Sequence, residues 1–112
     1  MQILARHLDQ ITIFDISGEI DLATSPELRK ALLRELREAR MPRVVLNLKA
    51  VRYIDSSGVA SLVEGLKASR EVGARFILCG LNKTVREVLQ LSKLLRIFEV
   101  YENEEQAVEP GR

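Results

Sequence analysis

The feature that most constrains the fold is an alternation of short apolar runs with a longer amphipathic segment in the middle of the chain. Residues 44–48 (VVLNL) form a nearly continuous apolar run, which is typical of a strand covered on both faces. Apolar residues then recur at helical spacing over residues 59–66, and this segment ends at Gly73. Residues 76–79 (FILC) form a second buried-type strand. A strand, a helix and a strand in succession predict a right-handed βαβ unit with parallel strands.

The flanking segments extend this unit into a larger sheet. Residues 2–8 and 11–17 predict two strands joined by a turn, and Gly18 is expected to end the second one. The other expected elements are a helix starting at Thr24-Ser25-Pro26-Glu27 and stopping at Met41-Pro42, a helix capped by Thr84, an edge strand over 97–101 and a short closing helix. The order β-β-α-β-α-β-α-β-α predicts an α/β fold, a mixed sheet of four to five strands with helices packed on it. We expect a single domain over residues 1–112, with its core at about 2–108.

Composition excludes several classes of protein. The 17 basic and 16 acidic residues nearly cancel and are interleaved, so the net basic excess of a direct nucleic-acid binder is absent. No apolar run approaches the roughly 20 residues that span a bilayer, and residues 1–10 carry charges where a signal peptide has an apolar core. The single cysteine, Cys79, cannot form an internal disulfide. We therefore expect a cytoplasmic protein without direct membrane insertion.

The usual constellations of catalytic and metal-binding residues are missing. His7 is the one histidine and lies in the first expected strand, where it is interpreted as a surface residue and not as part of a triad. One His and one Cys cannot build a zinc site, and Cys79 is expected to be a buried, inert thiol. The Lys83-Thr84 pair lacks the glycines of a phosphate-binding loop. These absences favour a protein that is not an enzyme and has no cofactor or bound metal.

One loop stands out against this background. Asp55-Ser56-Ser57-Gly58 lies between a buried strand and an amphipathic helix, where unpaired backbone N–H groups and the helix dipole favour a negative group. A phosphoryl group on a serine at this point would gain local hydrogen bonds. Asp and Ser are also ordinary N-cap residues, and Gly suits a tight turn before a helix. The loop on its own therefore fits both a plain helix cap and a phosphorylation site.

The chain resembles the STAS domain, and in particular the stand-alone anti-sigma factor antagonists (anti-anti-sigma factors), along nearly its whole length. Ser17-Gly18-Glu19-Ile20-Asp21 matches the family's Gly-Glu-hydrophobic-Asp element. Residues 44–48 match its central strand, and residues 53–58 match its phosphorylation loop. The family's common Gly-Leu-Gly after the serines appears here as Gly58-Val59-Ala60, so Ala60 adds a methyl group where a partner would approach.

This resemblance implies a protein that switches partners. It implies that Ser56 is the phosphoacceptor, that the partner is an anti-sigma factor which is also a serine kinase of ATPase fold, and that a serine phosphatase reverses the modification. In the unphosphorylated state the chain would bind this partner and release a sigma factor. The residues expected to contact the partner are Asp21, Asp55, Ser56, Ser57, Gly58 and Val59. The alternative is a cytoplasmic STAS subunit that regulates a membrane transporter of lipids or anions.

Overall fold

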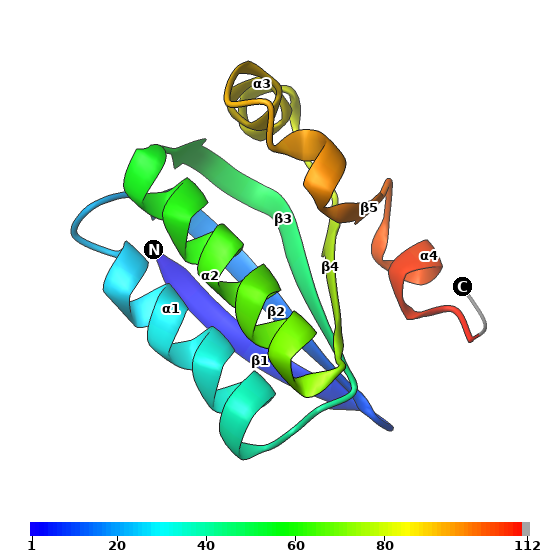
Figure 1. Ribbon diagram of the computed structural model, residues 1–112. Coiled ribbons are helices and arrows are strands. Elements are labelled where there is room, and N and C mark those ends of the chain that lie inside the picture. Colours follow the sequence, from blue (N-terminus) through cyan, green and yellow to red (C-terminus); the bar gives the residue numbers. More distant parts are fainter. Residues whose placement is uncertain (111–112) are drawn as a thin grey trace.

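The computed structural model describes residues 1–110 and contains a five-stranded sheet in the order β1-β2-β3-β4-β5 (Figure 1). The strands are β1 (Gln2–Leu8), β2 (Ile11–Ile20), β3 (Arg43–Ile54), β4 (Arg75–Cys79) and β5 (Glu99–Tyr101). β1 runs antiparallel to β2, and every other neighbouring pair is parallel. The predicted mixed sheet and the parallel βαβ unit around residues 44–79 are therefore confirmed.

The helices between the strands follow the predicted order. They are α1 (Ser25–Leu33), which continues into a π-helical turn η1 (Arg34–Glu38), then α2 (Ser56–Val72), α3 (Lys83–Leu91), a 3-10 turn η2 (Leu95–Ile97) and α4 (Glu104–Val108). α2 ends at Gly73 in the left-handed conformation, as the sequence predicted. No helix among residues 1–110 combines the length and the apolar character needed to span a bilayer.

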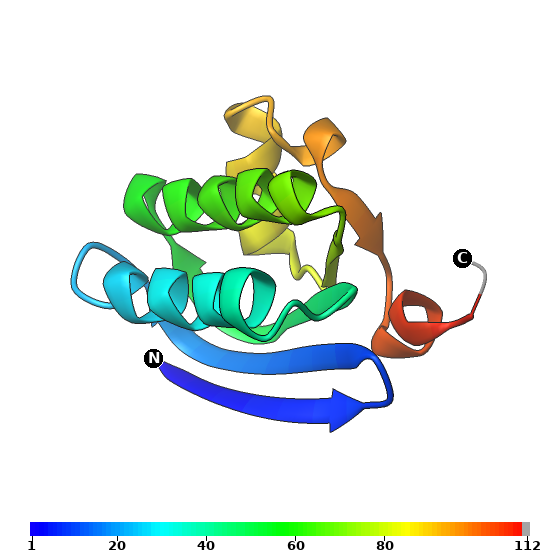
Figure 2. The ribbon, with the colours of Figure 1, turned by 60° about the horizontal axis from the view of Figure 1, so that its bottom comes forward.

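The two faces of the sheet are covered differently. α1 and α2 lie side by side on one face (Figures 1 and 2), and their Leu28, Leu32 and Leu62 are fully buried in the larger core. Side chains alternate between the two faces along each strand, and those that point away from α1 and α2 form a smaller core on the other face. The members of this second core are Ile13, Val45, Ile77, Cys79 and Ala107, the last of which is on α4. α4 is thus the helix that shields the second face.

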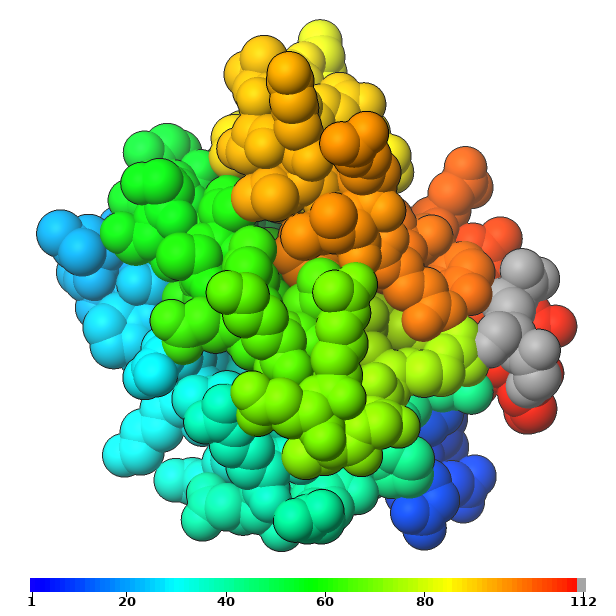
Figure 3. All heavy atoms as spheres, in the orientation of Figure 1, coloured from blue at the N-terminus to red at the C-terminus, as the bar shows by residue number. Residues whose placement is uncertain are grey.

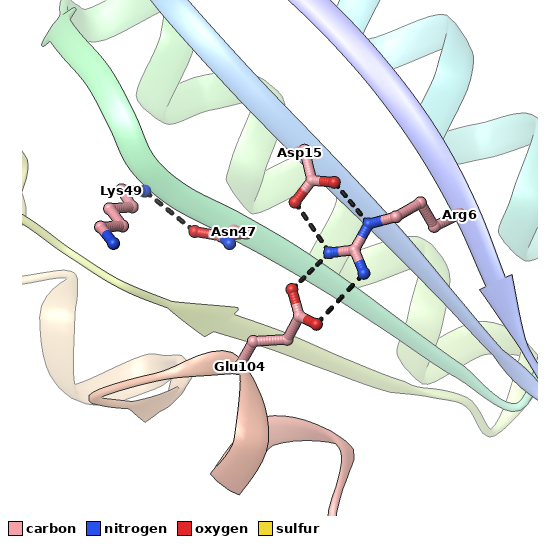
Figure 4. A network of polar contacts seen from close by, with 5 residues as sticks. All are labelled: Arg6, Asp15, Asn47, Lys49 and Glu104. Carbon is pink, nitrogen blue, oxygen red and sulfur yellow. Dashed lines mark hydrogen bonds and ion pairs between the residues drawn. The ribbon is translucent and has the colours of Figure 1, made fainter.

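A network of charged side chains attaches α4 to the sheet (Figure 4). Arg6 on β1 donates hydrogen bonds to both Asp15 on β2 and Glu104 on α4. The hydrogen bonds that Arg6 donates to these two carboxylates raise its pKa above the usual value. Nearby on β3, the side chain of Asn47 accepts a hydrogen bond from the backbone N–H of Lys49 at 3.1 Å.

Two local predictions are wrong. Gly18 does not end β2; it has φ +87° beside a register shift in the β2–β3 pairing, and the strand continues to Ile20. Thr84 does not cap α3; Asn82 does, by accepting a hydrogen bond from the N–H of Val85 at 3.0 Å. The Asn82 amide also donates to the Val51 carbonyl of β3, a long-range contact that favours Asn82 over the nearby Thr84 as the cap.

Candidate functional site

The extended β2 and β3 end together, and this brings two carboxylates to one edge of the sheet. Ile20 and Ile54 are paired in the parallel register, and the N–H of Asp55 donates to the carbonyl of Ile20 at 3.2 Å. Asp21 and Asp55 are the residues that directly follow the two strands. The carboxyl ends of parallel strands are where α/β proteins commonly place functional side chains.

Asp55 holds the start of α2. Its side chain accepts a hydrogen bond from the N–H of Gly58 at 3.0 Å, while its extended backbone conformation is that of an N-cap. Ser56 is the first residue of α2 and is exposed, and no hydrogen bond to its hydroxyl occurs within residues 1–110. Ser57 is half-buried, and its carbonyl accepts a hydrogen bond from the Ser61 hydroxyl at 3.2 Å. The hydroxyl of Ser56 is therefore open to solvent.

Gly58 and Val59 lie beneath this loop. A Cβ on Gly58 would be 2.6 Å from both the Ile20 carbonyl oxygen and Cγ1 of Ile54, so the backbone of α2 touches the strand ends directly. Val59 is only 6% exposed and belongs to the larger core. These two residues support the loop from inside, and the solvent-accessible surface here is provided by Asp21, Asp55, Ser56 and Ser57.

Asp21 is fixed by the turn that it starts. Its carboxylate accepts hydrogen bonds from the N–H groups of Ala23 and Thr24 at 3.0 and 3.1 Å. The Thr24 hydroxyl occupies the N-cap position of α1 but donates to the Glu19 carbonyl at 2.8 Å instead of capping the helix. The segment between β2 and α1 is therefore held rigidly by its own short hydrogen bonds.

A shallow hollow lies between the two aspartates. Its lining consists of Asp21, Leu22, Ala23, Tyr53 and Asp55. Leu22 is 75% exposed and Tyr53 is 47% exposed, which is unusual for large apolar side chains on either side of a polar hollow. Sequence reasoning did not identify these two residues. The available signal was that Leu22 lies in a turn, ahead of the apolar repeat of α1 that starts at Leu28.

His7 and Cys79, which the sequence analysis set aside as catalytic residues, make their contacts elsewhere in the molecule. Nε2 of the exposed His7 lies 2.9 Å from Oε1 of Glu35, and Oε1 also accepts a hydrogen bond from the Thr12 hydroxyl at 2.7 Å. The carboxylate thus separates the imidazole from the hydroxyl. Cys79 is fully buried, and burial raises the pKa of its thiol to about 11. No cluster of three or more potential metal ligands occurs in the part of the chain that the structure describes.

Comparison with known proteins assigns this chain to a family. The chain belongs to the STAS domain family, whose model matches residues 2–107. A relative from Paenibacillus polymyxa, named anti-sigma F factor antagonist, is 30% identical over 108 residues, which cover 96% of this chain and 92% of the relative.

Solved structures share the fold at lower identity. Bacillus SpoIIAA in its phosphorylated form is 21% identical with a TM-score of 0.77, and the match covers 99% of this chain and 100% of that one. A sulfate transporter family protein from Wolinella succinogenes is 18% identical with a TM-score of 0.78, over 90% of this chain and 84% of that one. The fold by itself is therefore compatible with either of the two functions that the resemblance implied, and the names of the curated relatives favour the anti-sigma factor antagonist over the transporter subunit.

Proposed function

We propose that the chain is an anti-sigma factor antagonist whose binding surface is the loop region of Asp21, Asp55, Ser56 and Ser57. The observation that carries this proposal is the exposed hydroxyl of Ser56 on the first residue of α2, beside a capping carboxylate. The name of the relative from Paenibacillus polymyxa, which spans nearly the same length, supports it. In this role the chain is a ligand and a kinase substrate in the cytoplasm, and not a catalyst.

Phosphorylation of Ser56 would act as the switch. A phosphoserine carries about −1.5 to −2 charges at pH 7, next to the carboxylates of Asp55 and Asp21. The helix N-terminus tolerates that charge in the free protein, because its first N–H groups point toward it. In a complex the same charge must be desolvated or face repulsion, and a cost of about 4 kcal/mol corresponds to about a thousandfold weaker binding. The fold itself need not change.

The partner is proposed to be an anti-sigma factor that is also a serine kinase of ATPase fold. The exposed side chains of Leu22 and Tyr53 would supply apolar contact area around the two carboxylates. Because the Asp55 carboxylate is engaged in capping α2, the kinase is expected to supply its own base. A separate serine phosphatase must then remove the phosphate to restore binding.

The test uses the anti-sigma factor that co-purifies with the chain from its own cells. With ATP, the intact mass of the wild type should increase by one phosphate, and that of Ser56→Ala should not. By calorimetry, Ser56→Ala should bind as tightly as the wild type and Ser56→Asp about a thousandfold more weakly. Thr84→Asp is a matched control, because Thr84 is an exposed hydroxyl residue in the first turn of α3. Equal affinity of Ser56→Ala and Ser56→Asp would refute the switch.

The transporter function is the competing candidate, favoured by the fold shared with the Wolinella succinogenes protein. A docking subunit does not require a phosphorylatable serine, so the exposed Ser56 after Asp55 favours the anti-sigma function. The same co-purification separates the two: recovery of a membrane permease in place of a soluble kinase would support the transporter function.

A further inference from the structure

A second exposed surface lies at the end of α3 and in η2. It consists of Gln90, Leu91, Lys93, Leu95, Arg96 and Ile97, and is called the α3–η2 patch below. Gln90, Lys93, Leu95 and Arg96 line a small hollow, and Leu91 and Ile97 are exposed large apolar residues of the same segment. Figure 3 shows the gold and orange atoms of this segment protruding beside α2.

The local fold explains why these side chains are exposed. Val85 and Leu89 take the buried positions of α3, so Leu91, two residues after Leu89, remains 85% exposed. Lys93 then ends the helix with φ +58°, and the N–H of Leu94 donates to the carbonyl of Leu89 at 2.9 Å. This closed turn holds the chain between Leu91 and Arg96 in one conformation. An exposed leucine on a rigid turn is suited to insert into a partner.

The patch is also basic. Four of the five charged residues in the segment 83–97 are Lys or Arg, although the whole chain has a net charge of only +1. Lys83 forms an ion pair with Glu87, at 3.9 Å, within the same helix. Within residues 1–110, Lys93 and Arg96 have no carboxylate at ion-pair distance. Two cations without a carboxylate at ion-pair distance therefore follow the exposed leucine, at two and five residues along the chain.

The patch is separate from the proposed switch. In Figures 1 and 2, η2 lies apart from the first turn of α2, which bears Ser56. The charges differ as well, because the hollow beside Ser56 has two aspartates and the patch has two cations without an ion-pair partner. One partner segment of uniform charge could not complement both surfaces.

We propose that the α3–η2 patch is a docking surface for an acidic segment of a protein partner, in which an apolar side chain is flanked by Asp or Glu. Leu91 and Ile97 provide apolar contact, and Lys93 and Arg96 bind the flanking carboxylates. A membrane surface fits less well, since an amphipathic helix that inserts into lipid presents a continuous apolar face. Here the apolar face of α3 is buried against the domain.

The probe for this surface is a synthetic acidic peptide with one central leucine flanked by glutamates, with a lysine-flanked peptide of the same length as its control. In NMR titration of the full chain, the acidic peptide should shift amide signals within residues 83–97 and leave those of residues 53–58 unchanged. Binding should weaken as salt rises from about 50 to about 300 mM, because the contacts are charged. Lys93→Glu combined with Arg96→Glu should weaken it at least tenfold, and Leu91→Ala about fivefold.

Lys30→Glu is the control variant, since Lys30 is an exposed lysine on α1 that is remote from the patch in sequence, and it should bind as the wild type does. Ser56→Asp should also leave peptide binding unchanged, so the result is independent of the proposed switch. The proposal fails if neither peptide shifts residues 83–97 or if both do so equally. It also fails if vesicles of an anionic phospholipid bind the chain through Lys93 and Arg96 while the acidic peptide does not.

Discussion

At residue 58, the absence of a side chain allows α2 to begin directly against the ends of β2 and β3. A Cβ at this position would lie 2.6 Å from the Ile20 carbonyl oxygen, which leaves no room for a methyl group, and a backbone oxygen cannot rotate away. Ser56 is two residues before this contact, so its position on the surface depends on the close approach at Gly58. The loop is thus built from a buried residue outward.

Gly58→Ala is therefore expected to destabilise the fold by about 2 kcal/mol, although alanine is the better helix former. Urea denaturation measures this change. Gly73→Ala is the comparison variant. A Cβ added at Gly73 would have nothing within 4 Å, so the substitution would strain only the left-handed backbone conformation of this residue. It should lose about 1 kcal/mol. A Gly58→Ala protein as stable as the wild type would show that α2 can shift away from the strands.

At the level of elements, α4 is a five-residue helix that depends on contacts with the sheet for its position. Arg43 on β3 donates to the carbonyls of Ala107 and Glu109 at 3.2 and 3.1 Å, and Arg6 binds Glu104. Short helices are marginal by themselves, so these contacts and the burial of Ala107 hold the segment in place. Cys79 lies in the core beneath it.

Loss of the Arg43 contacts should increase local opening of α4, and Cys79 reports it as the single cysteine. With a thiol reagent at about pH 8, Arg43→Ala should be labelled about tenfold faster than the wild type, which corresponds to about 1.4 kcal/mol. Arg37→Ala serves as the control, since the Arg37–Glu71 ion pair joins η1 to α2, away from α4. Equal rates for Arg43→Ala and the wild type would mean that α4 does not gate access to the thiol.

At the scale of the whole molecule, the short strand β5 forms one edge of the sheet. Burial alone would raise the pKa of Glu99 on β5, but hydrogen bonds from Arg75 and Tyr101 outweigh it and hold the pKa below its usual value. A carboxylate with a lowered pKa in the folded state stabilises the fold above its unfolded pKa, about 4.3. This contribution is lost as the pH falls through the lower folded value.

Acid destabilisation of the wild type should therefore be steeper than that of Glu99→Gln between about pH 5 and about pH 3. Chemical denaturation over that pH range measures the free energy of unfolding of both proteins. Glu38→Gln, at an exposed position on η1, controls for the loss of one negative charge. Parallel pH curves for Glu99→Gln and the wild type would rule out the Arg75–Glu99 contact as a source of acid sensitivity.

Much of the architecture was predictable, because it rests on local patterns. The apolar run at residues 44–48, the helical spacing after Ser56 and the terminal Gly73 depend on residues near one another in sequence, and the structure confirms all three. The extent of β2 and the cap of α3 were not predictable in this way. The extent of β2 depends on its pairing with β3, and the cap of α3 depends on the contact between Asn82 and Val51.

The sequence alone determined the order of strands and helices and marked the Asp55–Gly58 loop, because hydrophobic period and cap chemistry are local properties. Only the tertiary structure decided which of those residues reach the surface. It left Ser56 exposed, placed Val59 in the core and set Asp21 beside Asp55 through the pairing of Ile20 with Ile54. The physical reason is that burial and register depend on contacts between segments far apart in the chain, which no local pattern specifies.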